Sequence, residues 1–568
     1  MKHSTPRRGG AGKGFMAHME EKKKLVVVIA AFLTSAAIVL LLNGLREHAI
    51  ADLVQNLRTS ALGGAPEEQV APAWANFSNI YVPPGAGYSS TLHQLLQANG
   101  TTACHNQSTN FTRLEGLPRS KKGKVLLKTN TRYQFSLVAY TADGKRRCAG
   151  GDYYEVDLHN ERYRARLPTT DFDNGTYGLE LEVPARWAGV FSLEIWLLFG
   201  NWHGMDIFGE QYAVLQVVTA QELHVILPQA QLLDATFQRN MTRCAAQDFT
   251  RPHWSGRWTR GWFNEACEAD EEKRFRCLPG EHFGCEEPWC AGPLGRLESN
   301  GWSYSAHCSF KIFERDEAWS CLDGRWLFMW GDSNFQDTVR NLLLFILDWQ
   351  LPPKANLADF QLERKYEQFF INPARPSQAF QVSMVFNGAN QYWDNGEGLH
   401  TLEHTEHQDT VATHFNGSRA PDTIIMNSGL HDGYKEIEDY LAVADFAVQW
   451  WVDFYTSLPA DRKPQLVWRT TVAPAGKSRN MPGNPHKMES YNHVMVEKLR
   501  AERHRMPVKF VDGFDLTFPF HYTNEFSDGG HYGRAPGVAL PPWHRKPHWY
   551  FVDIMLAHIF LNAICPAT

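Results

Sequence analysis

The strongest indication of the fold is the sequence Trp326-Leu-Phe-Met-Trp-Gly-Asp-Ser333, which is followed by an apolar segment through Val339 to Leu347. Its five apolar residues predict a buried strand, and the segment after Ser333 predicts a helix. Four more strands are predicted over 382–386, 423–426, 466–471 and 508–511, with helices over 437–454 and 488–503. This alternation predicts an α/β domain of three layers (α/β/α) over 326–568, with a doubly wound parallel sheet that binds ligands at the carboxyl ends of its strands.

The composition is that of a folded protein with room for two or three domains in 568 residues. It has 43% hydrophobic residues, 21% charged residues and a net charge of -6. The Lys and Arg residues are mostly dispersed, so nothing indicates a nucleic-acid partner. The 19 Trp residues fit sugar stacking, but a large aromatic core is the commoner use of this residue.

The N-terminus predicts a membrane anchor. Residues 25–45 are apolar and about long enough to cross a bilayer, while residues 1–24 carry seven Lys or Arg. By the positive-inside rule, 1–24 is a cytosolic tail and the rest is lumenal, as in a single-pass type II protein. The alternative is a cleaved signal peptide, whose apolar region is usually shorter. We therefore expect an uncleaved signal anchor.

Cysteines and glycosylation sequons also indicate a lumenal body. All ten Cys lie beyond the anchor, which predicts disulfides in an oxidising compartment. The eight from Cys244 onward allow 105 pairings, so only the participation of Cys308 and Cys321 is predicted. Seven sequons lie on the same side and are expected to be glycosylated: Asn76, Asn99, Asn106, Asn110, Asn174, Asn240 and Asn416.

The region between anchor and α/β domain divides into three parts. Residues 46–75 read as a stem, because Gly and Pro interrupt any periodicity. Short alternating runs over 76–230 predict a β-sandwich. Its clearest strands are 133–140, 153–158 and 189–196, and the turn 173–176 separates two others. Residues 231–325 form a Cys/Trp-rich segment leading into the α/β domain, and 549–564 reads as a closing helix too short for a second membrane span.

Three residues predict serine chemistry. Ser333 sits between a strand and a helix, where a hydroxyl is exposed and the helix N-terminus favours negative charge, although a helix cap is the simpler role. Near the C-terminus, Asp528 precedes His531 by three residues in a Gly-rich loop, so its carboxylate can orient the imidazole. Asp515 and His521 are alternatives that spacing does not exclude.

A second cluster consists of histidines. His400 and His404 have the i, i+4 spacing that suits zinc, with His407 and His414 close behind. No His-Glu-x-x-His arrangement is present, and the surrounding acids indicate a solvated polar segment. We therefore predict no metal site.

The two serine-chemistry blocks resemble the SGNH/GDSL hydrolase superfamily. The sequence Cys308-Ser-Phe-Lys-Ile-Phe…Cys321-Leu-Asp-Gly-Arg-Trp-Leu-Phe-Met-Trp-Gly-Asp-Ser333 resembles its PC-esterase branch, which includes the neurexophilin and PC-esterase (NXPE) proteins and the trichome-birefringence-like polysaccharide O-acetyltransferases. Gly151-Asp-Tyr-Tyr-Glu-Val and Asp173-Asn-Gly-Thr-Tyr177 resemble the Ig-like, filamin-type module of NXPE proteins. The resemblance covers roughly 125–565 and is specific at the two catalytic blocks.

The resemblance implies a role for each matching position. Ser333 is the implied nucleophile, His531 the general base and Asp528 its orienting acid. The implied oxyanion donors are Gly388, Asn427 and Gly429. The chain departs from the family at Gln336, where an Arg is common, and at Gly429-Leu-His431, which lacks the Gly-x-Asn order. An uncharged Gln336 puts oxyanion stabilisation or the choice of acyl donor in doubt.

The implied function is transfer of an acyl group, most simply acetyl, to glycan hydroxyls in the Golgi or a neighbouring secretory compartment. A glycan O-acetyl esterase would use the same residues, with water resolving the acyl-enzyme. A non-catalytic glycan- or receptor-binding protein is the alternative of another class. No cofactor is expected, and the acyl donor, such as acetyl-CoA or an acetylated carrier, is left open.

Overall fold

The computed structural model describes residues 89, 92, 107–120, 122–207, 209–228, 241–261, 263–270, 275–278, 294–349, 365–388, 397–534 and 549–565. All of them belong to one compact unit, Val70–Thr568. The predicted tail, anchor and stem, and the sequons at Asn76, Asn99, Asn106 and Asn240, lie outside the described residues. Among the residues that are described, no helix has the length and apolar character needed to cross a bilayer.

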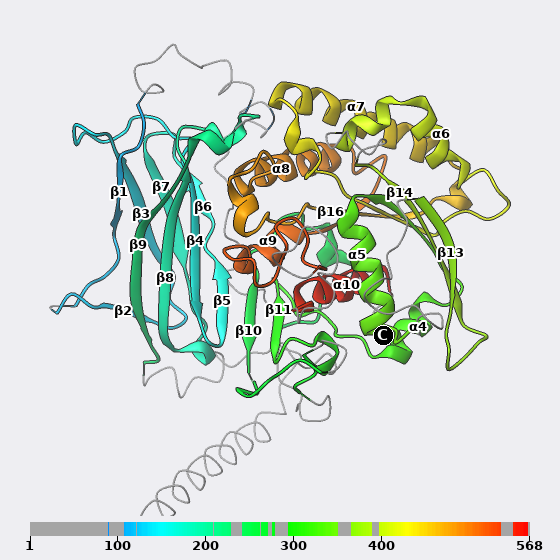
Figure 1. Ribbon diagram of the computed structural model, residues 1–568, viewed down its shortest axis with the longest axis horizontal. Coiled ribbons are helices and arrows are strands. Elements are labelled where there is room, and N and C mark those ends of the chain that lie inside the picture. Colours follow the sequence, from blue (N-terminus) through cyan, green and yellow to red (C-terminus); the bar gives the residue numbers. More distant parts are fainter. Residues whose placement is uncertain are drawn as a thin grey trace, which may run out of the picture. The chain divides into compact units, whose positions relative to one another are not determined.

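Two β-sheets pack face to face in the N-terminal half (Figure 1). The four-stranded sheet has the order β1-β3-β7-β6, and the larger one β11-β10-β5-β4-β8-β9-β2. Apolar residues alternate along the strands and fill the space between the sheets, as in a β-sandwich. The strands are β1 (Phe111–Glu115), β2 (Val125–Lys128), β3 (Tyr133–Tyr140), β4 (Tyr153–Asn160), β5 (Tyr163–Arg166), β6 (Thr169–Asp171), β7 (Thr176–Leu181), β8 (Gly189–Phe199), β9 (Ala213–Ile226), β10 (Arg257–Arg260) and β11 (Trp302–Ser305).

The strands predicted over 133–140, 153–158 and 189–196 are confirmed, as is the turn between β6 and β7. The larger sheet continues past residue 230, where the sequence placed the end of the sandwich. Its last two strands, β10 and β11, come from the Cys/Trp-rich segment, and β10 pairs with β5. The two halves of the chain therefore share a sheet.

The C-terminal half contains a six-stranded sheet with the order β13-β14-β12-β15-β16-β17. After the central strand β12, the chain adds β13 and β14 on one side of it and then β15, β16 and β17 on the other, which makes β12 the topological switch point. The strands are β12 (Trp326–Gly331), β13 (Lys365–Ile371), β14 (Ala379–Phe386), β15 (Thr423–Met426), β16 (Gln465–Arg469) and β17 (Val508–Val511).

The expectation of an all-parallel sheet is wrong at one edge. β13, which the sequence did not reveal, runs antiparallel to β14. Residues 372–378 join the two strands, and so short a connection permits a hairpin but no parallel crossover. The other strand pairs in this sheet are parallel.

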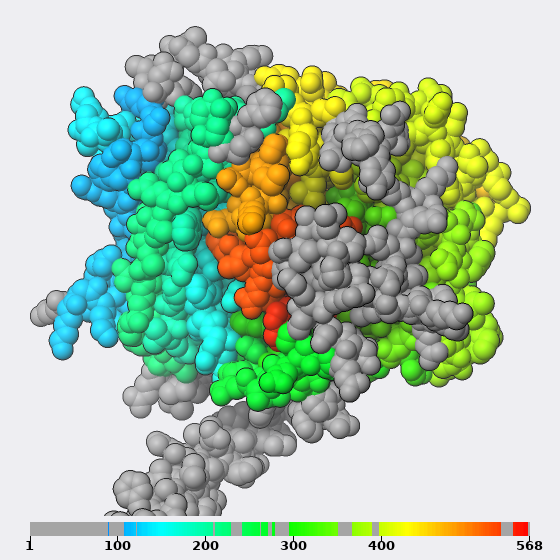
Figure 2. All heavy atoms as spheres, viewed as in Figure 1, coloured from blue at the N-terminus to red at the C-terminus, as the bar shows by residue number. Residues whose placement is uncertain are grey.

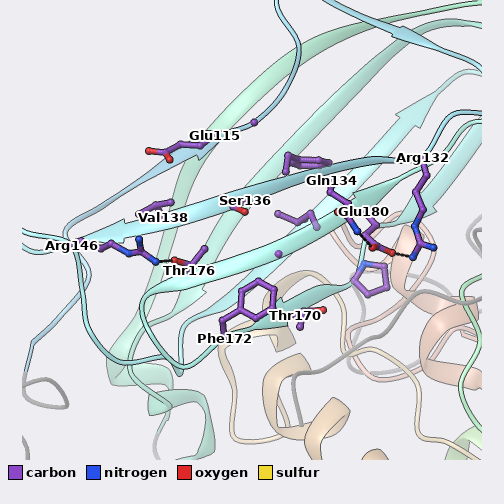
Figure 3. Close-up of a pocket in the computed structure, with 15 residues that line it drawn as sticks. Glu115, Arg132, Gln134, Ser136, Val138, Arg146, Thr170, Phe172, Thr176 and Glu180 are labelled. Atoms are coloured by element: carbon purple, nitrogen blue, oxygen red, sulfur yellow. Dashed lines mark hydrogen bonds and ion pairs between the residues drawn. The ribbon is translucent and has the colours of Figure 1, made fainter. Parts of the chain in front are cut away.

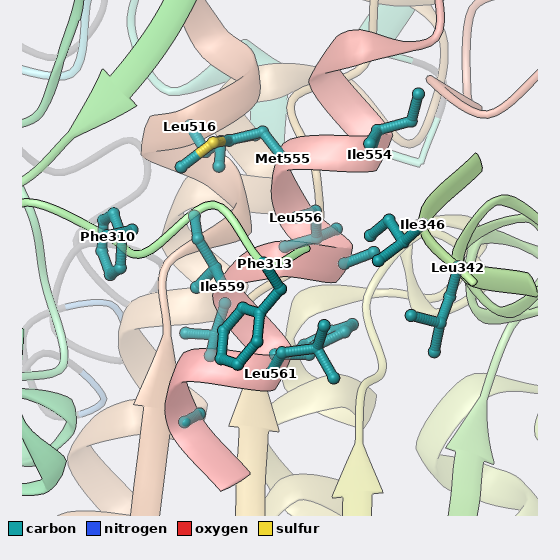
Figure 4. Packing of buried hydrophobic residues seen from close by; sticks show 14 of the residues in the cluster. Phe310, Phe313, Leu342, Ile346, Leu516, Ile554, Met555, Leu556, Ile559 and Leu561 are labelled. Carbon is teal, nitrogen blue, oxygen red and sulfur yellow. The ribbon is translucent and has the colours of Figure 1, made fainter. Parts of the chain in front are cut away.

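Helices cover both faces of this sheet. On one face, α5 (Ser333–Asn341) and α10 (Phe551–Ile564) pack on Leu327 and Met329. Figure 4 shows Ile554, Leu556 and Leu561 of α10 in this core, with Leu342 and Ile346. On the other, α6 (Thr405–Thr413), α7 (Ile437–Ser457) and α8 (Pro485–Ala501) pack on Phe328 and Trp330. β12 is thus apolar on both sides. The helix after Ser333 ends as the π-helical turn η10 (Leu342–Ile346), and α10 is the predicted closing helix.

Disulfides brace this region. Cys321, in α4 (Arg315–Leu322), is bonded to Cys565 at the end of α10, and Cys308 is bonded to Cys244. The predicted participation of Cys308 and Cys321 is confirmed. Cys267–Cys277 is a further disulfide, and Cys148 is also disulfide-bonded.

Helix α8 packs against the sandwich through buried polar contacts. Glu489 accepts hydrogen bonds from Arg166 of β5 and, at 3.0 Å, from the Tyr153 hydroxyl of β4. Nearby, Lys487 Nζ donates to the Asp206 carbonyl at 2.9 Å. In Figure 2 the orange surface of this region lies against the teal surface of the sandwich. These contacts fix the sandwich against the sheet that carries Ser333.

Candidate active site

Ser333 is the first residue of α5, directly beyond the switch-point strand β12. Asp332 caps the helix, because its Oδ1 accepts the Asn334 N–H at 3.0 Å. A Cβ at Gly331 would overlap the Phe335 ring, so only glycine fits this turn. Asp332 therefore has the helix-cap role that was the simpler prediction for Ser333, and the Ser333 hydroxyl is not used as a cap.

The structure brings Ser333, His531 and Asp528 into one hydrogen-bonded chain. Ser333 Oγ lies 2.6 Å from His531 Nε2, and His531 Nδ1 lies 3.1 Å from both Asp528 carboxylate oxygens. An ionised carboxylate only accepts hydrogen bonds, so Nδ1 carries the proton and Nε2 accepts that of the serine. This is the arrangement that makes a hydroxyl nucleophilic.

Asp528 is held in its ionised form. Burial raises the pKa of its carboxyl. The neighbouring His531, Arg534 and the Gly530 N–H have the larger, opposite effect, so the net pKa is lowered to about 2. Its Oδ1 accepts the backbone N–H groups of Gly530 at 3.1 Å and His531 at 2.9 Å. The carboxylate therefore fixes both the loop and the imidazole.

Helix α5 also holds the residues that follow His531. Arg340 donates to the Gly533 carbonyl, and Arg534 Nε donates to Asp337 Oδ2 at 2.7 Å. The Tyr532 hydroxyl donates to the Ala473 carbonyl at 2.8 Å. Since the helix that begins at the serine also anchors the histidine loop, their relative position is fixed by a rigid element.

The oxyanion donors implied by the resemblance lie at the same sheet edge. Asn387 N–H donates to the Gly331 carbonyl at 3.0 Å, and Asn427 N–H donates to the Trp330 carbonyl at 3.0 Å. Gly388 follows Asn387, so both strand ends meet the end of β12. Gln336 lies one turn into α5 and is half-buried. The donor roles of Gly388 and Gln336 stay predictions.

The side chain of Asn427 is fully buried and joins strands. Its Oδ1 accepts from Arg469 Nη2 at 2.7 Å, and its Nδ2 donates to the Arg469 carbonyl at 3.0 Å. Gly429, two residues on, has a φ of 153° and no room for a Cβ beside Thr471. Asn427 thus has a structural role in this arrangement, and its role as an oxyanion donor stays a prediction, as does that of Gly429.

Sequence reasoning missed Arg469. This arginine is fully buried at the end of β16, with Nη2 3.5 Å from Asp332 Oδ1 and its guanidinium 4.4 Å from the centre of the Phe335 ring. Burial lowers its pKa, and the Asp332 charge opposes that shift. Through these contacts with Asp332 and Phe335, Arg469 supports the Gly-Asp-Ser turn. No sequence motif indicates this role.

The alternative acid and base lie elsewhere. His521 Nε2 is 2.7 Å from Glu155 Oε1, within the buried contact between the sandwich and the α/β half. Asp515 Oδ2 accepts from the Tyr304 hydroxyl at 2.6 Å and the Gly256 N–H at 2.7 Å. The structure therefore pairs Ser333 with His531.

The histidine segment is helical, in η11 (Gly398–Glu403) and α6, where Leu399, Leu402 and Val411 pack into the core. The acids between the histidines, Glu403, Glu406 and Asp409, are exposed, so the predicted polar surface segment is confirmed. The exception is His407, which is buried. The four side chains have separate surroundings: His400 pairs with Glu403, His404 is exposed, His407 accepts the Trp330 indole N–H at 3.0 Å, and His414 contacts the Thr410 carbonyl.

One other grouping of metal-type ligands occurs in the described part of the chain, namely Asp248, His307 and Cys308. Cys308 is bonded to Cys244, so its sulfur is not a thiolate ligand. This grouping does not provide three ligands for a metal ion.

Comparison with known proteins gives no family assignment. No family profile matches the chain, and no curated protein matches it. Among solved structures, the native aryl esterase of M. smegmatis is 13% identical with a TM-score of 0.22, covering 42% of this chain and 98% of that one. The Lin-41 filamin domain is 10% identical with a TM-score of 0.15, covering 21% and 98%. These scores are too low to support an assignment of fold or function.

Proposed function

We propose that the protein is a serine-dependent acyltransferase of the SGNH type, related to the PC-esterase branch, that transfers an acyl group, most simply acetyl, to hydroxyls of glycans. The observation that supports this best is the hydrogen-bonded chain from Ser333 Oγ through His531 to Asp528. It lies at the switch point of a doubly wound sheet, where such folds bind their ligands.

The reaction consists of two balanced half-reactions. His531 Nε2 takes the proton of Ser333 as Oγ attacks the acyl carbonyl carbon of the donor, and the same proton then passes to the leaving atom, oxygen for an ester donor or sulfur for a thioester. The acyl group is now on Ser333. A sugar hydroxyl next gives its proton to Nε2, attacks the acyl-serine, and Oγ recovers the proton. Asp528 stabilises the imidazolium in both halves.

Backbone N–H groups at the strand ends are the proposed oxyanion donors, with Gly388 foremost, and such a donor contributes about 3–4 kcal/mol to the transition state. Gln336 would contribute a neutral hydrogen bond where the related proteins often have a cation. The oxyanion site of this chain is thus proposed to rely on neutral donors.

A lumenal location is part of the proposal. The disulfides Cys244–Cys308, Cys267–Cys277 and Cys321–Cys565 support it, because such bonds persist in oxidising compartments. Residues 25–45 are the proposed anchor, in the Golgi or a neighbouring membrane. A tag at the N-terminus should be digested by protease added to intact microsomes, while the domain beyond residue 70 is protected. The reverse pattern would contradict this topology.

The catalytic proposal is tested by labelling with a fluorophosphonate and by hydrolysis of a small acetyl ester, with and without a sugar acceptor. Ser333→Ala should abolish both signals, and Asp528→Asn should lower hydrolysis by about 10⁴-fold. Ser320→Ala, which removes an exposed serine hydroxyl, is the matched control and should behave as wild type. Acetylated sugar in the products identifies a transferase, whereas acetate alone identifies an esterase. Full activity in Ser333→Ala would reject the proposal and favour a binding role.

A further inference from the structure

The turn that follows β15 reaches across the carboxyl end of β12. It begins on one side of β12 at Asn427, whose N–H donates to the Trp330 carbonyl at 3.0 Å. The His431 ring extends to the other side, because a Cβ on Gly388, which follows β14, would lie 2.9 Å from His431 Cε1. Since β12 lies between β14 and β15, this imidazole spans the strand end from which Ser333 continues.

The same turn also meets the histidine loop and the last residue of β14. A Cβ on Gly530 would lie 3.9 Å from Leu430 Cδ1, and Gly530 directly precedes His531. The His431 ring packs edge to face on Phe386, with the ring centres 5.7 Å apart. Residues 430 and 431 therefore border the site on its serine side and on its histidine side.

Buried hydrogen bonds hold this turn in one conformation. Asp432 is fully buried, and its carboxylate accepts the Ser428 hydroxyl at 2.5 Å and the Leu399 N–H at 2.7 Å. Lys487 Nζ donates to the Gly433 carbonyl at 3.0 Å. The turn is thus preorganised, which reduces the conformational entropy that is lost when a ligand binds to it.

Two side chains of the turn share its outer face. In η12 (Asp432–Tyr434), a 3₁₀ turn, the Tyr434 N–H donates to the His431 carbonyl at 3.4 Å. Side chains three residues apart eclipse one another in a 3₁₀ turn, so His431 and Tyr434 lie on the same face. His431 is half-buried and Tyr434 is 43% exposed, whereas Asp432 and Gly433 between them are buried. The exposed tyrosine ring therefore lies beside the imidazole, at the solvent edge of the catalytic site.

We propose that this face binds the acceptor sugar, with the Tyr434 ring packed on the apolar C–H face of a pyranose and the His431 imidazole hydrogen-bonded to one of its hydroxyls. A tyrosine ring offers an apolar body with a polar tip, which suits such a ligand. The hydroxyl that is acylated must give its proton to His531, so His431 binds a neighbouring hydroxyl. The inference deepens the proposed function and rests on it, because it locates the acceptor that resolves the acyl-enzyme.

A concavity of about 680 Å³ on the outer face of the four-stranded sheet is a different surface (Figure 3). Polar side chains that line it bond to one another. Arg132 and Gln134 donate to Glu180, and Arg146 donates to the Thr176 hydroxyl. These residues belong to the sandwich, whereas the nucleophile begins a helix of the α/β half. A sugar held in this concavity is not placed at the acyl-serine, so the acceptor subsite is assigned to the turn after β15.

The test is a competition between two acceptors for the same acyl-enzyme. An activated acetyl ester is the donor, and the acceptors are glycerol, which has hydroxyls but no ring face, and the methyl pyranoside of galactose, glucose or N-acetylglucosamine in turn. Both products arise from one intermediate, so their ratio does not depend on how fast it forms. Tyr434→Ala should lower the ratio of acetylated pyranoside to acetylated glycerol by about 10-fold, and Tyr434→Phe should keep it. Tyr212→Ala, at a sandwich tyrosine that is 42% exposed, is the control and should behave as wild type.

His431 is tested by a matched pair of variants. His431→Asn keeps a group that can donate or accept a hydrogen bond, whereas His431→Leu is similar in size and has none. The ratio of acetylated pyranoside to acetylated glycerol should fall by about 10-fold in His431→Leu and be largely kept in His431→Asn. A purely structural role of His431 would instead change the transfer to both acceptors alike.

Binding of the pyranosides to Ser333→Ala, measured by saturation-transfer NMR, separates this inference from the proposed function. Adding Tyr434→Ala to that variant should abolish the transfer of saturation to the sugar. Binding that requires Tyr434, without acyl transfer in the wild type, would support the sugar subsite and overturn the catalytic function. Acyl transfer with an unchanged ratio in both Tyr434→Ala and His431→Leu would overturn the subsite but not the function. Absence of both acyl transfer and sugar binding would overturn the two together.

Discussion

Glu155 of β4 is a sandwich residue on which the position of the catalytic loop depends. Its carboxylate is fully buried and is contacted by Arg479 and, at 2.7 Å, by His521 Nε2. Burial alone raises the pKa of Glu155. The effect of His521 and Arg479 is larger and opposite, so the net pKa is lowered from the ordinary 4.5 to about 2. The group is therefore ionised and paired in the folded protein.

Both partners of Glu155 belong to segments that hold the catalytic loop. Arg479 lies in η14 (Gly476–Asn480), and the Gly476 N–H donates to the His521 carbonyl at 2.8 Å. The adjoining Ala475 N–H donates to the Gly529 carbonyl at 2.7 Å, next to Asp528. A change at Glu155 is thus transmitted through two short segments to the acid that orients His531.

We predict that Glu155→Gln destabilises the protein and slows catalysis. Gln has the same shape but leaves the buried Arg479 without a countercharge, and breaking a buried ion pair costs about 3–5 kcal/mol. The unfolding entropy grows with chain length, so for the unit Val70–Thr568 each kcal/mol lowers Tm by about 1 °C, and Tm should fall by about 3–5 °C. Because the loop then moves relative to Ser333, kcat should fall more than KM rises. Thermal unfolding and ester hydrolysis measure the two effects.

The pH dependence has a definite sign. Since the folded pKa of Glu155 lies below its ordinary 4.5, its stabilising contribution is present above pH 4.5 and is lost as pH falls towards 2. The Tm difference between wild type and Glu155→Gln should therefore shrink over that range. Glu161→Gln, at an exposed glutamate, is the control. An unchanged Tm and kcat in Glu155→Gln would show that Glu155 neither stabilises the protein nor positions the catalytic loop.

Two further substitutions test the support of the site. Cys565→Ser removes the disulfide to Cys321, which joins residues 244 positions apart, and should lower the free energy of unfolding by about 2–5 kcal/mol. This appears as a lower Tm under non-reducing conditions, and a wild-type Tm would contradict it. Gly331→Ala should abolish ester hydrolysis, because the new Cβ displaces the Phe335 ring and the turn after β12. The control Gly189→Ala should keep activity, because its Cβ meets only Asn160 Nδ2, at a van der Waals distance of 3.9 Å. Equal activity in both variants would contradict the steric explanation.

The parallel strands could be predicted because they are buried on both faces. The strands at 423–426 and 508–511 have the predicted bounds, and their apolar runs end at polar or glycine residues. β13 escaped prediction because an edge strand needs only one apolar face, and its Lys365-Tyr-Glu-Gln start resembles a loop. β10 and β11 were missed because they combine Trp with polar and charged residues and so show no apolar run.

The part of the site that lies in local sequence motifs could be predicted, and the part that depends on tertiary contacts could not. Ser333, Asp528 and His531 lie in short local motifs, and the structure places them in contact. Arg469 has no local signal, because it lies in a strand 136 positions after Ser333 and acts through tertiary contacts alone. The burial of His407 was not predicted, because it depends on the Trp330 side chain of a distant strand.

The most direct test of the central claim is to trap the acyl-enzyme. The purified protein is mixed with an activated acetyl ester, quenched in acid during the first turnover and digested for peptide mass spectrometry. If Ser333 is the nucleophile, we expect one acetyl group, on the peptide that contains Ser333, with none in Ser333→Ala and little in His531→Ala. Acetylation at another residue, or ester turnover that persists in Ser333→Ala, would contradict it.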